Sequence, residues 1–195
     1  MEKQPDIRIF IACHKPTYVP ENPIFYPVQV GTALTEKRLE HMAYRDNEGD
    51  NISGKNPDYC ELTAQYWAWK NIDCDYYGLF HRVCSVMASG RILGKRQHPY
   101  IELDSVWDDL TPYWMEAEWM VQQIAKYDLL TVYRERINTT VYRQYCQYHE
   151  AEELNHMLEI VNRVYPEYTD SVKTYMSSKD IYYMNMYIMK KELFH

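Results

Sequence analysis

Two short clusters of basic side chains follow stretches typical of buried strands, and such side chains could hold an anionic ligand. His14 and Lys15 come directly after an apolar run at residues 7–12. His81 and Arg82 follow a second apolar run further along the chain. In an open α/β sheet, ligands bind outside the carboxyl ends of the strands. The two clusters therefore predict a site where cationic side chains stabilise negative charge.

A polar loop between these clusters could bind phosphate. Glycine lets the backbone approach a ligand closely, and a lysine supplies a point charge to phosphate oxygens. The loop leads into a helix that is expected to begin with Asn56 as N-cap and Pro57 at the first helical position. Free amides at a helix start carry partial positive charge, so a diphosphate could bind there. The candidates are Gly49, Asp50, Asn51, Ser53, Lys55 and Asn56.

Turns and caps explain this loop about equally well, because it matches neither G-x-x-x-x-G-K-[ST] nor G-x-G-x-x-G. A lone loop carboxylate such as Asp50 more often caps a turn than acts as a base. Glu61, expected near the start of the helix, could merely complement the helix dipole. Both remain candidates for a general base. No H-x-x-x-H pattern predicts a metal site.

Aromatic side chains offer a second kind of chemistry, since the chain carries 20 tyrosines. Tyrosine combines a flat apolar ring with a polar tip, which suits sugar rings or partner chains, although most are expected at the edge of the core. Tyr66, Trp67 and Trp69 could stack against a sugar, but such residues are more often core. His149, on an expected long helix, is more often a surface histidine than a ligand.

The elements that must position these residues alternate between strand and helix, which predicts an α/β fold with a mainly parallel sheet in one domain. The expected strands cover residues 7–12, 27–31, 75–81 and 127–133. The expected helices cover residues 57–71, 115–126 and 139–164. The first helix is apolar on two faces, so it is expected to be well buried.

Bulk properties limit the function classes. A formal net charge of -7 leaves no basic footprint, so nucleic acid is not expected as a partner. The five cysteines are odd in number and form no C-x-x-C pair, which favours a reducing compartment over disulfides or a zinc ribbon. Neither a signal peptide nor a membrane-length apolar run is present, so the sequence predicts a cytoplasmic protein.

The order of these stretches resembles the DUF4422 family. The matching stretches are Cys13-His14-Lys15-Pro16, Val30 to Leu34, Gly49 to Ser53, Lys55-Asn56, Tyr59 to Thr63, Tyr66 to Asn71, Asp75 to His81, Tyr145 to His149, Tyr165 to Tyr168 and Asn185 to Phe194. Together they span almost the whole chain. The block from residue 49 to residue 71 is too long to arise from composition.

The resemblance implies a GT-A-like, Rossmann-type glycosyltransferase of bacterial exopolysaccharide or capsule synthesis. Such an enzyme would move a hexose from a nucleotide sugar, with uridine diphosphate (UDP) the expected nucleotide, to a glycan acceptor on a lipid carrier. Manganese or magnesium (Mn or Mg) could accompany the nucleotide. Contact with the inner face of the membrane or with a partner transferase would follow from such an acceptor.

The resemblance also gives the candidate residues roles. Catalysis is expected from Asp50, Glu61 and His81. The donor is expected to contact His14, Lys15, Arg82 and the loop residues Gly49, Asp50, Asn51, Ser53, Lys55 and Asn56. The acceptor is expected to contact Tyr66, Trp67, Trp69, His149 and Asn185.

Two departures from the family pattern leave other functions open. The family has H-Y-R-R-Y where this chain has His81-Arg82-Val83-Cys84-Ser85, and a shift of one residue in a strand turns a side chain to the opposite face. The single domain over residues 1–195 also stops where the family continues into a further helical segment. A degenerate member that binds a nucleotide sugar, a glycan or a partner without turnover is therefore an alternative. A tyrosine-rich interaction protein that binds no nucleotide is a third.

Overall fold

The computed structural model describes residues 4–81 and 116–195, so Arg82 and the altered segment behind it lie outside the described residues. Contacts within the chain divide it into two compact units. The first unit comprises Met1–Thr131 with Asn185–His195, and the second comprises Val132–Met184. Each unit is described by itself, and the expected single domain over residues 1–195 stays a prediction.

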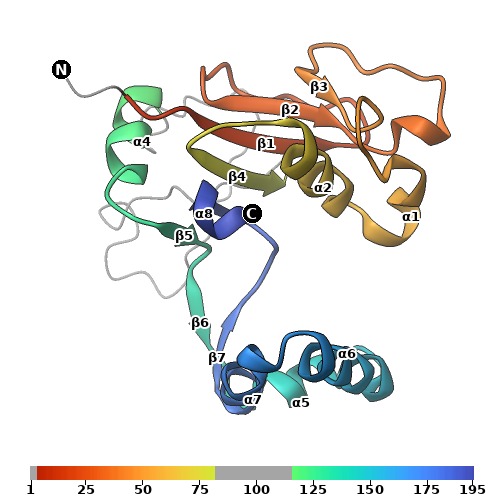
Figure 1. Cartoon of the computed structure of the whole chain (residues 1–195), viewed down its shortest axis with the longest axis vertical. Helices are drawn as coiled ribbons and strands as arrows, with labels where there is room; N and C mark the ends of the chain where they lie inside the picture. Colours follow the sequence, from red (N-terminus) through yellow and green to blue (C-terminus); the bar gives the residue numbers. More distant parts are fainter. Residues whose placement is uncertain (1–3, 82–115) are drawn as a thin grey trace. The chain divides into compact units, whose positions relative to one another are not determined.

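The first unit is built on a six-stranded sheet with the order β3-β2-β1-β4-β8-β5 (Figure 1). Its strands are β1 (Ile7–Cys13), β2 (Phe25–Gln29), β3 (Tyr44–Arg45), β4 (Tyr76–His81), β5 (Leu129–Thr131) and β8 (Tyr187–Lys190). The first four strands pair in parallel, whereas β8 runs antiparallel to both β4 and β5. The predicted α/β class with a mainly parallel sheet is thus confirmed.

The connections of this sheet reverse direction between β1 and β4. From β1 the chain passes outward to β2 and β3, and it then returns to place β4 on the other side of β1. The register sets Ala12 beside His81, so the two strands end together. Such a switch point is where open α/β sheets bind ligands.

Pro27 lies within β2 and explains why that strand carries a short neighbour. Its carbonyl accepts a hydrogen bond from the Ala43 amide at 2.8 Å, just before β3 begins. Proline has no N–H to donate to a sheet, so it is tolerated only where no partner strand needs one. The strand expected at residues 27–31 instead runs from Phe25 to Gln29.

The helix expected over residues 57–71 is two helices, α1 (Asn56–Tyr59) and α2 (Leu62–Asn71). The break falls at Cys60, whose φ of 47° is left-handed, a conformation that no helix accommodates. Asn56 does not act as the expected N-cap, because its side-chain amide donates to the Cys60 carbonyl at 2.7 Å. It thereby stabilises the break.

One face of α2 packs against the sheet, which corrects the expectation that two faces are buried. Thr63, Ala64, Trp67 and Ala68 are buried, whereas Leu62 and Trp69 are each 38% exposed. The Trp67 ring meets the edge of Phe10 at a centroid distance of 6.2 Å. The described residues of the unit also form the helices α4 (Ala117–Ile124) and α8 (Lys191–Phe194), together with the 3-10 turns η1 (Thr32–Leu34) and η2 (Ser53–Lys55).

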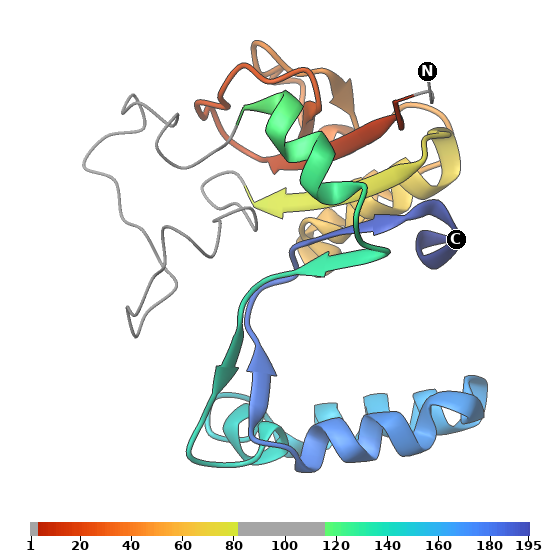
Figure 2. The ribbon, with the colours of Figure 1, turned by 90° about the vertical axis from the view of Figure 1, so that its left-hand side faces the viewer.

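The second unit contains a two-stranded antiparallel sheet and a small group of helices (Figure 2). Its elements are β6 (Arg134–Arg136), α5 (Val141–Tyr145), α6 (Ala151–Val164), the turn η4 (Pro166–Tyr168), α7 (Thr169–Ser177) and β7 (Asp180–Tyr182). The single helix expected over residues 139–164 is therefore wrong, because α5 and α6 are separate. The buried apolar side chains here are Val141, Leu154 and Ile181 among the described residues. In the described segments of both units, every helix is too short or too polar to cross a membrane.

Candidate functional site

The switch point carries a pair of titratable side chains. His81, the last residue of β4, places Nε2 3.5 Å from Oε1 of Glu61. Glu61 directly precedes α2, and the turn at Cys60 sets its position. Their side chains are 38% and 23% exposed, so the pair is partly shielded yet open to a ligand. A carboxylate beside an imidazole fixes its orientation and stabilises its protonated form, which suits proton transfer.

Two further cationic candidates lie at the adjoining strand end. His14 and Lys15 directly follow β1, and both are exposed. Because β1 and β4 are parallel neighbours that end together, these two residues and His81 lie at the same carboxyl-terminal end of the strands, called the sheet edge below. With Glu61, the structure thus brings four of the expected site residues to this end of the sheet.

A buried carboxylate that the sequence reasoning missed fixes the loops beside this edge. Asp46 is fully buried and accepts five hydrogen bonds. The donors are the amides of Gly31 (2.8 Å) and Thr32 (3.1 Å) and the hydroxyls of Thr32 (2.7 Å), Ser53 (2.6 Å) and Thr63 (2.7 Å). A buried charge is tolerated only when it is hydrogen-bonded in this way. Asp46 therefore ties the segments after β2 and β3 to α2.

The loop residues expected at a phosphate mostly bond within the loop. Ser53 is buried, and its hydroxyl also accepts from the Ala33 amide at 3.0 Å. The Asn51 amide donates to the carbonyls of Asn47 and Gly49 at 3.2 and 2.8 Å. The side-chain groups of Ser53 and Asn51 are therefore occupied, which favours the structural explanation of turns.

The helix start behind this loop gives little support to the expected diphosphate site. Helix α1 has four residues, with Lys55 as its N-cap and Asn56 as its first residue. A macrodipole needs several aligned peptide units, so a helix this short offers little positive charge. Lys55 itself is exposed and remains a candidate for a phosphate contact.

Asp50 lies away from the switch point. Its amide donates to Oδ1 of Asn71 at 3.0 Å, and its carbonyl accepts from Nδ2 of Asn71 at 2.8 Å. Asn71 ends α2 whereas Glu61 precedes it, so about 15 Å of helix separates them at 1.5 Å per residue. The expected trio of Asp50, Glu61 and His81 is therefore not one cluster, and Asp50 serves the loop.

Gly49 makes this anchoring possible. Its φ of 66° is left-handed, and a Cβ at this position would collide with Oδ1 of Asn71. Glycine is the residue that accepts both the dihedral and the close approach. The conformational role of Gly49 thus explains its presence without a phosphate.

The residues expected at the acceptor are spread over the molecule. Trp67 is only 3% exposed and donates from Nε1 to the Glu48 carbonyl at 2.7 Å. It is therefore a core residue, and the expectation that it contacts the acceptor is wrong. His149 belongs to the second unit, where it is exposed and stacks on Tyr145 at 4.6 Å, which favours the surface explanation. Asn185 precedes β8 and is exposed; since β8 is antiparallel to β4, this end of β8 lies on the edge where β4 ends.

The half-buried Tyr66 and the exposed Trp69 pack together in the second half of α2. Their rings meet edge to face at 5.7 Å, and Nζ of Lys70 lies 3.4 Å from the Trp69 centroid. The Tyr66 hydroxyl donates to Oδ1 of Asp50 at 3.2 Å. Burial and the negative charge of Asp50 raise the pKa of Tyr66. The group is held together by aromatic and cation–π contacts.

A metal ion at the switch point would have few protein ligands. In residues 4–81 and 116–195, no three His, Cys, Asp or Glu side chains are grouped to hold one. Magnesium is commonly held by one or two carboxylates while substrate phosphates and water supply the rest. Glu61 could contribute such a carboxylate, whereas Asp46 is fully occupied by hydrogen bonds.

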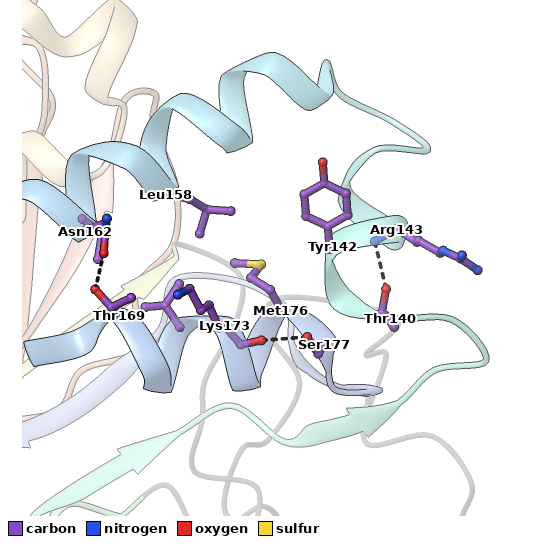
Figure 3. A pocket seen from close by; sticks show the side chains of 11 residues that line it. Thr140, Tyr142, Arg143, Leu158, Asn162, Thr169, Lys173, Met176 and Ser177 are labelled. Atoms are coloured by element: carbon purple, nitrogen blue, oxygen red, sulfur yellow. Dashed lines mark hydrogen bonds between the residues drawn. The ribbon is translucent and has the colours of Figure 1, made fainter. Parts of the chain in front are cut away.

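A hollow of about 380 Å³ lies elsewhere, between α6 and α7 in the second unit (Figure 3). Leu158 and Met176 point into it, and a hydrogen bond of 2.8 Å between Thr169 and Asn162 joins the two helices beside it. Its walls are mainly apolar, which does not suit a charged diphosphate. The donor is accordingly not assigned to this hollow.

The parallel sheet, its switch point and the polar edge define the class of this protein as a GT-A-like α/β domain. The chain belongs to the DUF4422 family, described as a domain of unknown function, whose profile matches residues 8–195.

Among solved structures, the chain is similar to the apo structure of WbbM, a bifunctional glycosyltransferase. The match has a TM-score of 0.81 and 29% sequence identity, and it covers 96% of this chain. This chain spans about a third of that protein, 34% of its length. No curated protein sequence matches this chain significantly.

Proposed function

We propose that this protein is a glycosyltransferase that moves a hexose from a nucleotide sugar, with UDP as the nucleotide, to a glycan acceptor. The observation that carries the proposal is the match to a bifunctional glycosyltransferase over 96% of the chain. The basic side chains at the ends of β1 and β4 support it, because a leaving diphosphate needs positive charge. The wider setting we propose is bacterial cell-surface polysaccharide synthesis on a lipid-linked acceptor.

Charge develops on the leaving diphosphate as the bond from the sugar to phosphate breaks. Lys15 and His14 are placed at the sheet edge to stabilise that charge, and Lys55 is a further candidate. Manganese or magnesium held by Glu61 and the phosphates would add to this stabilisation.

The acceptor hydroxyl must lose a proton as it attacks the sugar. His81 is our choice for the group that takes this proton, and Glu61 at 3.5 Å orients the imidazole and stabilises its charged form. Asp50 has no part in this step, because its backbone is bound to the far end of α2. Asn185 is our choice for an acceptor contact at the same edge.

We further propose a cytoplasmic location, with the acceptor or a partner transferase met at the inner face of the membrane. Within the described residues Cys60, Cys74 and Cys146 form no disulfide, and this supports a reducing compartment. Burial raises the pKa of Cys74 to about 12, so that thiol is kept protonated and unreactive.

A second candidate function is a degenerate family member that binds a nucleotide sugar or a glycan without turnover. The departure of the segment after His81 from the family pattern favours it. Restoring the family sequence with Arg82→Tyr, Val83→Arg and Cys84→Arg separates the two functions. A large gain in turnover would mark the natural sequence as impaired, and unchanged activity would support an intact enzyme.

The test of the proposed function is calorimetric titration of the whole chain with UDP, GDP and CDP, each with and without manganese. The nucleotide that binds is then offered as its hexose conjugate, and nucleotide release is measured. Micromolar binding followed by release supports the transferase. Binding without release supports the degenerate binder. No nucleotide binding by a folded protein contradicts the transferase and a nucleotide-sugar binder alike.

A further inference from the structure

The second unit contains an open groove of about 540 Å³ between α7, β6 and β7. Arg134 of β6, Asp180 and Tyr182 of β7, and Asp170 and Tyr175 of α7 line it. Its volume falls within the usual range of small-molecule sites. The groove is wide and mainly lined by polar and aromatic side chains, so it differs from the apolar hollow between α6 and α7.

Two tyrosines give the groove an aromatic wall. The rings of Tyr175 and Tyr182 lie 6.5 Å apart and are inclined by 32°. Their geometry is held by a hydrogen bond of 3.4 Å between the Tyr182 amide and the Tyr175 hydroxyl. Tyr182 is 45% exposed, so much of its surface is open to a ligand. Such rings combine an apolar face with a polar tip.

Charged groups also line the groove. Nη1 of Arg134 lies 3.9 Å from Asp180, a distance at which the guanidinium keeps donors free for a ligand. Asp180 is held more closely by Arg136, at 3.2 Å. The carboxylate of Asp170 has no hydrogen bond or ion pair within the described part of the chain. The groove thus offers both strong acceptors and strong donors.

Neutral polyols match this combination better than other ligands do. Adjacent hydroxyls of a sugar can each donate to a carboxylate and accept from a guanidinium, while the C–H face of the ring packs on an aromatic side chain. A phosphate would be repelled by Asp170 and Asp180, and an apolar chain would leave these charges without water or partners. The walls therefore select an uncharged, hydroxyl-rich molecule.

We propose that this groove binds a saccharide segment of a glycan chain. The proposal rests on the proposed function in taking a glycan as the ligand of this protein, but it requires no donor nucleotide. A growing polysaccharide would be held here by the second unit through contacts that do not take part in the transfer step. Tyr175 and Tyr182 then have a specific function in ligand binding.

The test measures glycan binding by the whole chain without nucleotide. Labelled protein is applied to an array of immobilised oligosaccharides from bacterial cell-surface polysaccharides, and each bound oligosaccharide is titrated by calorimetry. Tyr182→Ala and Asp170→Asn are the groove variants. Their matched controls are Tyr168→Ala and Glu167→Gln, which alter an exposed tyrosine and an exposed acid of the same unit outside the groove. Circular dichroism verifies that each variant is folded.

We expect the natural chain to bind at least one oligosaccharide and each groove variant to bind it about tenfold more weakly. The controls should stay within about twofold. A folded natural chain that binds no glycan, or groove variants that bind like the controls, would overturn the proposal. The natural chain could bind a glycan but no nucleotide. If Tyr182→Ala then loses the glycan binding, the groove proposal is supported while the proposed function fails.

Discussion

Nε2 of His81 lies 3.5 Å from Oε1 of Glu61, which joins the end of β4 to the start of α2. The pair exists because the chain turns sharply at Cys60, where φ is 47°, and so α2 starts afresh beside the sheet edge. A continuous helix from residue 57 would have set Glu61 on a different part of the helix surface. The helix break is therefore part of how the sequence builds its candidate site.

Replacing Glu61 tests this pair. In Glu61→Gln the amide can still contact His81 but no longer stabilises a protonated imidazole, so nucleotide release from a UDP-hexose should fall about 100-fold or more. UDP affinity measured without a divalent metal ion should change by less than about twofold. Asp58→Asn, which alters an exposed acid in α1, is the control and should keep full turnover. Equal turnover in both variants would remove Glu61 from the mechanism.

Asp46 is expected to matter for stability. Asp46→Asn keeps the shape but turns an NH₂ group toward hydrogen-bond donors, so at least two of the five bonds are lost inside the protein. Urea unfolding should show a loss of about 3 kcal/mol in the free energy of unfolding. Asp50→Asn, an exposed change in the same loop, should cost less than about 1 kcal/mol. A loss for Asp46→Asn no larger than this control would show that the network is unimportant.

Two glycines in one loop provide a matched pair. Gly49→Ala forces a left-handed φ on alanine and collides with Asn71, so it should cost at least about 1–2 kcal/mol in unfolding free energy. Gly54→Ala meets no atom within 4 Å and should stay within about 0.5 kcal/mol of the natural chain. Equal melting temperatures for the two variants would contradict the assigned role of Gly49.

Much of the sheet could be predicted from sequence, because strand signals are local. The apolar run at residues 7–12 is β1, and the run that ends at His81 is β4. Both are flanked by basic residues at the carboxyl end, so the site edge could be located from the order of residue types alone. The strand predicted over residues 127–133 is also present, as the three-residue β5.

The helix breaks could not be predicted, since they depend on contacts distant in sequence. Nothing in the types of Cys60 or Glu61 signals a left-handed residue, and the break is held by the Asn56 side chain. The break between α5 and α6 likewise contains no proline or glycine. Periodicity alone therefore joined helices that the structure separates.

Asp46 illustrates why the site residues were harder to identify. In the sequence it looks like any acid at the start of a polar loop, and its five donors come from positions 31 to 63. Asp50 and Trp67 show the opposite problem: their residue types suit catalysis and sugar stacking, and so they were predicted as site residues. The structure uses one to fasten a loop and the other to fill the core.

The most direct test of the donor site compares two lysines in a titration with UDP. Lys15 follows β1 at the switch point, whereas Lys70 lies near the far end of α2 with its ammonium on the Trp69 ring. Lys15→Ala should weaken UDP binding about tenfold through the loss of one charge-assisted contact, and Lys70→Ala should leave it within about twofold. Equal affinity for Lys15→Ala and the natural chain, or no binding by the folded natural chain, would contradict a donor site at the ends of β1 and β4.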